Sequence, residues 1–270
     1  MDHSVLIALG LTLFAGLSTG IGSAIAFFSK RTNTTMLSVS LGLSAGVMIY
    51  ISFVELYASS LAKMADIYGK ATGNLYALLS FFGGILLIMV IDFLVPEKEN
   101  PHEMVEVVMM SKAHHTTPLS TTSLARTGLI SAIVIAIHNF PEGMVTFLTA
   151  LEEPTLGLPI AIAIAIHNIP EGISVSVPIY YATGNRGKAF WVSFASGLAE
   201  PLGAMVGYLL LRPYLTPSLF GILNAAIAGI MVYISLDELL PAAEKYGKHH
   251  LAILGVIAGM LIMALTLVIL

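Results

Sequence analysis

Long apolar segments divide this chain of 270 residues, and they decide what it can fold into. Hydrophobic residues make up 57% of the chain and charged residues only 10%, against about 25% in a typical soluble domain. A helix of about 20 apolar residues crosses a bilayer core of about 30 Å. The sequence therefore predicts an all-α integral membrane protein with eight transmembrane helices, at residues 5–28, 36–59, 75–95, 124–150, 158–181, 187–211, 218–243 and 251–270.

Two copies of one motif lie in the middle of this pattern. HNFPEG at residues 138–143 returns as HNIPEG at 167–172, one copy in each helix of a predicted hairpin. Because residues i and i+4 share a helix face, each copy places an imidazole and a carboxylate side by side. The two copies are about equally far from the connecting loop, so they are expected at the same depth, near the bilayer centre. His138, Glu142, His167 and Glu171 then form a cage that suits zinc and related divalent ions. The alternative is that each His only bonds to a neighbouring helix.

Carboxylates recur inside the predicted helices without basic partners. No Lys or Arg falls deep inside any of these helices, and the chain has no Cys, so a metal site must use nitrogen and oxygen ligands. A charge at the bilayer centre costs about 2.5–3.5 kcal/mol, so protons or a bound cation are expected to neutralise these side chains. The carboxylates in question are Glu55, Glu142, Glu171, Glu200, Asp237 and Glu238.

The roles of the carboxylates outside the hairpin differ. Glu200 is expected to bind a metal rather than to form only a structural hydrogen bond. Glu55 and Glu238 occupy equivalent positions in a second repeat, in which GVMIYISFVEL at 46–56 matches GIMVYISLDEL at 229–239. With Asp237 they could gate the path, relay ions, hold ions briefly, or be protonated and buried. The second and seventh helices, which carry this repeat, run in opposite directions, and inverted repeats are typical of transporters.

The basic residues of the loops predict the orientation. Nine of the twelve Lys and Arg fall on one side, which the positive-inside rule makes cytoplasmic. They are Lys30, Arg31, Lys98, Lys112, Arg126, Arg186, Lys188, Lys245 and Lys248, whereas Lys63, Lys70 and Arg212 lie on the other side. We therefore expect a single transmembrane domain over residues 1–270, with a cytoplasmic His-containing loop at 96–122 and both termini extracytoplasmic. The expected location is a plasma membrane or a bacterial inner membrane.

The motifs HNFPEG, HNIPEG and SGLAE, the last at residues 196–200, resemble those of the ZIP family of divalent metal transporters, in its bacterial zinc permease branch. The likeness extends over essentially all eight helices. It implies a fold in which inverted three-helix repeats flank the fourth and fifth helices, with a binuclear metal centre between those two. The primary ligands implied are His138, Glu142, His167 and Glu171, and those of the second metal position are Asn139, Asn168 and Glu200. Glu55 falls near a position that contributes to the entrance in relatives.

The sequence thus predicts uptake of divalent cations, chiefly Zn2+, with Fe2+, Mn2+, Co2+ and Cd2+ as further substrates. The metal is cargo rather than a cofactor, and no enzyme activity is expected. A metal-gated channel or a metal sensor stays open as an alternative. An intramembrane metalloprotease is less favoured, because its H-E-x-x-H pattern puts two His on one helix. The expected partners are divalent ions and the lipid bilayer, with a homodimer left open and no nucleic acid.

Overall fold

The computed structural model describes residues 3–28, 34–94, 121–152, 154–246 and 249–269, without the side chains of some of them, such as His138. Nearly all of the predicted loop 96–122 lies outside these ranges. Within them the chain forms helices and no strand, as predicted for an all-α protein. Seven helices in the described ranges are long and apolar enough to cross a membrane. The predicted fourth helix is present as α6, Thr121–Glu152, but is not one of the seven, so the count of eight spans stays a prediction.

Within each described range the helices follow one another with short connections. In chain order they are α1 (His3–Phe28), α2 (Thr34–Ile51), the π-helical turn η1 (Ser52–Tyr57), α3 (Ala58–Tyr68), α4 (Lys70–Leu94), α6 (Thr121–Glu152), α7 (Pro154–Thr183), α8 (Arg186–Gly197), α9 (Ala199–Leu211), the 3-10 turn η3 (Arg212–Tyr214), α10 (Pro217–Ile234), the π-helical turn η4 (Ser235–Leu239), α11 (Leu240–Tyr246) and α12 (His249–Ile269).

The predicted boundaries were wrong at one hairpin. The second helix was expected to end at residue 59 and the third to begin at 75, but α2, η1 and α3 run on to Tyr68 and α4 begins at Lys70. Gly69, with a φ of 80°, makes the turn in a conformation that side chains with a Cβ rarely adopt. Hydropathy marks where a helix leaves the apolar layer, and these two helices continue beyond that point.

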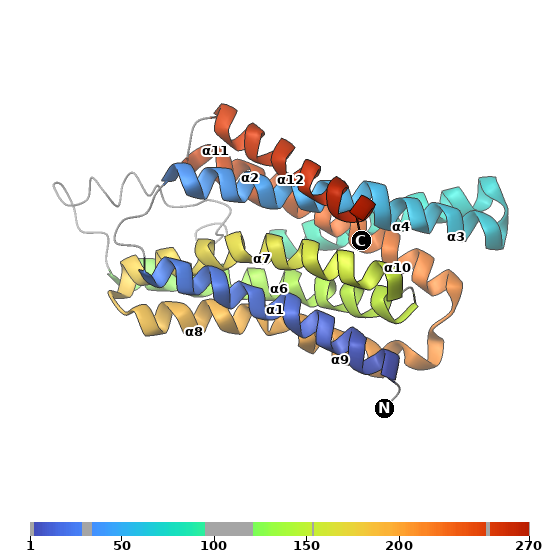
Figure 1. Cartoon of the computed structure of the whole chain (residues 1–270), viewed down its shortest axis with the longest axis horizontal. Coiled ribbons are helices and arrows are strands. Elements are labelled where there is room, and N and C mark those ends of the chain that lie inside the picture. The colour runs from blue at the N-terminus through green and yellow to red at the C-terminus, as the bar shows by residue number, and fades with distance from the viewer. Residues whose placement is uncertain (1–2, 29–33, 95–120, 153, 247–248, 270) are drawn as a thin grey trace.

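The helices form two groups (Figure 1). The α7 group consists of α1, α6, α7, α8 and α9, in which α7 contacts both α1 and α6. The α2 group consists of α2, α3, α4, α10, α11 and α12, in which α2 contacts α12 and α4 contacts α10. Across the boundary α2 packs against α7 and α10 against α6. The boundary therefore brings the hairpin with the HNxPEG motifs against the helices with the second repeat.

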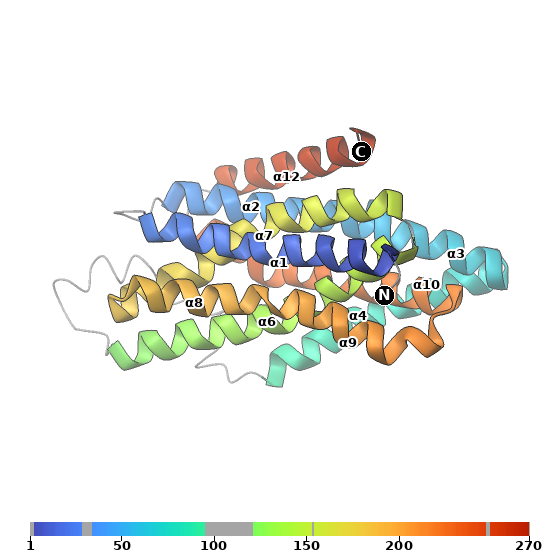
Figure 2. The same ribbon diagram turned by 60° about the horizontal axis from the view of Figure 1, so that its bottom comes forward.

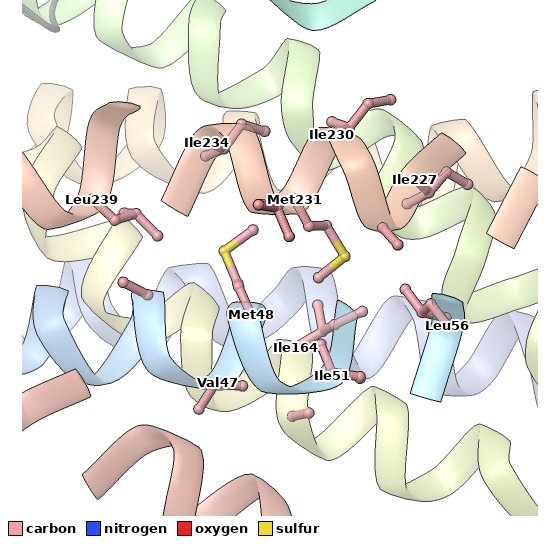
Figure 3. Packing of buried hydrophobic residues seen from close by; sticks show 14 of the residues in the cluster. Val47, Met48, Ile51, Leu56, Ile164, Ile227, Ile230, Met231, Ile234 and Leu239 are labelled. Atoms are coloured by element: carbon pink, nitrogen blue, oxygen red, sulfur yellow. The ribbon is translucent and has the colours of Figure 1, made fainter. Parts of the chain in front are cut away.

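The two copies of the second repeat adopt the same local structure. Helices α2 and α10 run in opposite directions (Figures 1 and 2), and each continues into a π-helical turn that begins with a buried serine. The hydroxyl of Ser52 donates to the carbonyl oxygen of Met48 at 2.7 Å, and that of Ser235 donates to the carbonyl oxygen of Met231 at 2.7 Å. The side chains of Met48 and Met231 meet in the apolar core between the two helices (Figure 3).

Equivalent glycines set the spacing of equivalent helix pairs. A Cβ added to Gly46 on α2 would lie 2.0 Å from the carbonyl oxygen of Val256 on α12. One added to Gly229 on α10 would lie 2.0 Å from the carbonyl oxygen of Phe81 on α4. Only glycine permits backbones to approach so closely, a common device in membrane helices. The pairs α2–α12 and α10–α4 thus correspond in sequence and in contact.

Candidate metal centre

Helices α6 and α7 carry the two HNxPEG motifs, and both run unbroken through the motif prolines, Pro141 and Pro170. The chain between them is a single residue, so the helices form a tight hairpin. Each of the described candidate ligands in the motifs is at most 1% exposed, which places them deep among helices rather than at a surface. These ligands are Asn139 and Glu142 on α6 and His167, Asn168 and Glu171 on α7. The side chain of His138 lies outside the described residues.

The imidazole of His167 lies next to carboxylates from both helices. Its Nε2 atom lies 3.4 Å from Oε1 of Glu142 and 3.3 Å from Oε1 of Glu171. Ligand atoms that bind one ion tetrahedrally at about 2.0–2.2 Å are about 3.3–3.6 Å from each other. The two distances from Nε2 of His167 match this spacing between ligand atoms. As they stand, however, the described side chains include no group of three or more His, Asp or Glu arranged to hold an ion.

The carboxylate of Glu142 is buried on α6. Within the described part of the chain, neither of its buried oxygens accepts a hydrogen bond. Burying an ionised carboxylate without compensation is costly, so a proton or a cation must neutralise it. The imidazole of His167 and the carboxylate of Glu171 lie beside it, so these three side chains are the candidates to share a cation.

Glu200 joins this centre from α9 through Asn168. The amide Nδ2 of Asn168 donates to Oε1 of Glu200 and to the carbonyl oxygen of Ala15 on α1, the latter at 2.9 Å. Both amide hydrogens are thereby used. Among the described residues, no donor reaches the other Glu200 oxygen or Oδ1 of Asn168. Two oxygen atoms of the kind that binds divalent ions are thus buried beside the first group.

The glycine that ends each motif brings a third helix close. A Cβ on Gly143 would lie 2.0 Å from the carbonyl oxygen of Glu200, and one on Gly172 would lie 2.1 Å from that of Thr19 on α1. The residues predicted to bind metal were only the His, Asn and Glu of each motif. The repeated glycine was the visible signal that α9 and α1 approach the motifs this closely.

Ser44 is a contact that the sequence analysis missed. Its hydroxyl, on α2, forms a hydrogen bond with Nδ1 of His167 and lies 3.5 Å from the carbonyl oxygen of the same residue. In the sequence, Ser44 stands among Gly42, Ala45 and Gly46, so it resembles a small residue that permits close helix contact. Gly42 and Gly46 do lie against the backbone of α12.

The three carboxylates of the suggested relay lie in the π-helical turns. Glu55 belongs to η1, and Asp237 and Glu238 belong to η4, and all three are half-buried. The turn η1 contacts α10, and η4 contacts α2. These carboxylates therefore lie where the two repeat copies meet, whereas the motif ligands lie on the α6–α7 hairpin.

Comparisons with known proteins bear on these residues. The family model described as ZIP Zinc transporter matches residues 94–267, which include both motifs and Glu200. A protein of Nitratidesulfovibrio vulgaris named zinc transporter ZupT is 59% identical over 270 residues, which cover 98% of each chain. Proteins of the same name from Chlorobium chlorochromatii and Lysinibacillus sphaericus are 55% and 54% identical, with 98% or more of each chain covered.

Proposed function

Because this chain belongs to the ZIP zinc transporter family, we propose that it takes up Zn2+ across the bacterial inner membrane into the cytoplasm. The relatives that share more than half of its residues over their full length are named zinc transporters. The same residue types suit Fe2+, Mn2+, Co2+ and Cd2+ as further substrates.

The observation that carries this proposal is the buried negative charge of the α6–α7 hairpin. Glu142 and Glu171 both approach Nε2 of His167, and all three side chains are at most 1% exposed. The chain has no Lys or Arg from residue 127 to residue 185, so neither motif has a Lys or Arg near it in the hairpin as a countercharge. A divalent cation supplies that charge and binds the imidazole nitrogen at the same time.

The proposed centre holds two ions. The first is bound by His138, Glu142, His167 and Glu171. The second lies beside it, between Asn139, Asn168 and Glu200, with the motif carboxylates as bridges. In sites of this kind two metal ions are about 3.5–4 Å apart. The second position has two neutral amides among its ligands, so it is the weaker one.

The path runs through a single domain of eight spanning helices with both termini extracytoplasmic. Inverted three-helix repeats flank α6 and α7, and the matching local structures of the two repeat copies support this arrangement. Dehydrated ions pass between the ligands of α6 and α7 while the α7 group moves against the α2 group. Glu55, Asp237 and Glu238 lie near that boundary and relay ions toward or away from the centre.

Zinc uptake into liposomes tests the proposal. Purified protein is reconstituted around a trapped fluorescent zinc indicator, and the initial rate is compared with that of Glu171→Gln. The control is Glu152→Gln, which makes the same chemical change at the end of α6, where the carboxylate pairs with Lys63 at 2.7 Å. Wild type and control should transport and Glu171→Gln should not.

The same preparation separates the alternatives. A sensor binds zinc but moves none into the liposomes. A channel passes zinc currents that can be resolved for single molecules in a planar bilayer. Either result would replace the transporter proposal.

A further inference from the structure

Ser44 is a buried hydroxyl on α2 whose hydrogen bonds reach a proposed zinc ligand on α7. It is 0% exposed, and its Oγ contacts Nδ1 of His167 and, at 3.5 Å, the carbonyl oxygen of that residue. A buried hydroxyl costs free energy unless it is hydrogen-bonded. Its partner here is a side chain of the other helix group.

The second copy of the repeat has no hydroxyl at the equivalent position. At the repeat offset, Ala45 and Gly46 match Ala228 and Gly229, but Ser44 matches Ile227, which is 2% exposed. By contrast, the hydroxyl of Ser52, which bonds within its own helix, has an equivalent in the other copy, that of Ser235. The hydroxyl of Ser44 therefore has a partner that α2 contacts and that has no counterpart beside α10.

This partner is His167, and its chemistry explains why it needs a hydroxyl group beside it. Its Nε2 faces the carboxylates of Glu142 and Glu171 at 3.4 and 3.3 Å. For Nε2 to bind zinc, its lone pair must be free and the ring proton must sit on Nδ1. An Nδ1–H in this environment needs an acceptor, and histidine ligands generally have one.

We propose that Ser44 positions His167 for zinc by accepting its Nδ1–H, while the Ser44 hydroxyl proton points to the His167 carbonyl oxygen. This role rests on the proposed zinc transport. Ser44 is a positioning residue, because it touches the ligand and not the ion. Since Ser44 belongs to the α2 group and His167 to the α7 group, the bond also ties the ligand to the relative position of the two groups.

The test compares Ser44→Ala with Ser38→Ala. Both serines lie on α2 and are 0% exposed, but the Ser38 hydroxyl donates to the backbone carbonyl oxygen of Ala243 at 2.6 Å and touches no proposed ligand. Alanine favours a helix, so both variants should fold. The zinc dissociation constant of each purified protein is measured by calorimetry. Histidine partners of this kind typically contribute about 10–100-fold in metal affinity, so Ser44→Ala should lose about tenfold or more and Ser38→Ala should keep the wild-type Kd.

A spectroscopic measurement gives a second readout. In zinc-loaded protein labelled with 15N-histidine, the Nδ1–H of His167 should give a hydrogen-bonded resonance, identified by its loss in His167→Gln. In Ser44→Ala that resonance should shift or vanish, and in Ser38→Ala it should stay.

The outcomes separate this inference from the transport proposal. An unchanged Kd and resonance in Ser44→Ala would overturn the role of Ser44 while wild-type zinc uptake stands. If both substitutions weakened zinc binding equally, the effect would come from the loss of any buried hydrogen bond of α2. That result would also overturn the role of Ser44. Absence of zinc binding and uptake in wild type would overturn the proposed function, and this inference with it.

Discussion

Replacing Gly143 by Ala adds one methyl group at a place where the backbones of α6 and α9 lie against each other. The new Cβ would lie 2.0 Å from the carbonyl oxygen of Glu200 and 2.4 Å from its Cα and carbonyl carbon. All three are backbone atoms, so no side-chain rotation relieves the contact. Ordinary contact begins at 3.4 Å, so the helices must separate by roughly 1.4 Å, the difference between 3.4 and 2.0 Å.

That separation acts directly on the proposed second metal position. Glu200 is held by the amide of Asn168 on α7, and a hydrogen bond does not survive a displacement of this size. A misplacement of about 1 Å can cost a reactive site about 100-fold in rate, so we expect zinc uptake to fall by about tenfold or more.

Uptake into liposomes, per molecule of folded protein, measures this effect. Gly83→Ala is the matched control, because a Cβ at that position meets nothing within 4 Å and alanine is the better helix former by about 1 kcal/mol. The control should transport like wild type. If Gly143→Ala did so as well, the close approach of α6 and α9 would have no part in holding the metal centre.

Four other predictions concern the ions, the pH and the orientation. Glu142→Ala and Glu171→Ala should each abolish zinc uptake, because each removes a charge that compensates ion desolvation; wild-type rates in either would exclude this hairpin as the path. Glu200→Gln should bind one zinc ion where wild type binds two, as seen by metal analysis and anomalous scattering, and two ions in the variant would give Glu200 another role. Uptake should weaken as pH falls through about 6.5, the ordinary pKa of free histidine, because protons compete with zinc for the imidazoles; a rate that is independent of pH from 7.5 to about 5.5 would contradict this. A cysteine at Ser111, in the loop outside the described residues, should react with impermeant reagents only from the cytoplasmic side. Labelling from outside in intact cells would contradict the predicted orientation.

The closeness of His167 to Glu142 and Glu171 could be predicted, because local spacing and a short loop decide the arrangement of these side chains. The i,i+4 spacing puts His167 beside Glu171, and the symmetric hairpin brings Glu142 to the same depth. Glu200 stood out as a carboxylate in an apolar helix. Each of these predictions rested on the chemistry of one residue or on the number of residues between two positions.

Other features depended on contacts that the sequence does not reveal. Ser44 meets His167 only because α2 packs against α7, and 123 residues separate the two in the chain. The turn at Gly69 was missed because a helix can continue beyond the apolar layer that hydropathy detects. The break between α8 and α9 at Leu198 falls inside an apolar run that was expected to be one helix.

The two π-helical turns match in position as well as in sequence. A π-helical turn contains one residue more than the α-helical turn it interrupts, and such turns usually lie at functional sites. Here Ser52–Tyr57 and Ser235–Leu239 begin at equivalent serines, so both halves carry the extra residue at the same register. Two separate insertions at matching positions would be a coincidence. A common origin of the two copies, with the irregular turn already present, explains the match without two coincident insertions.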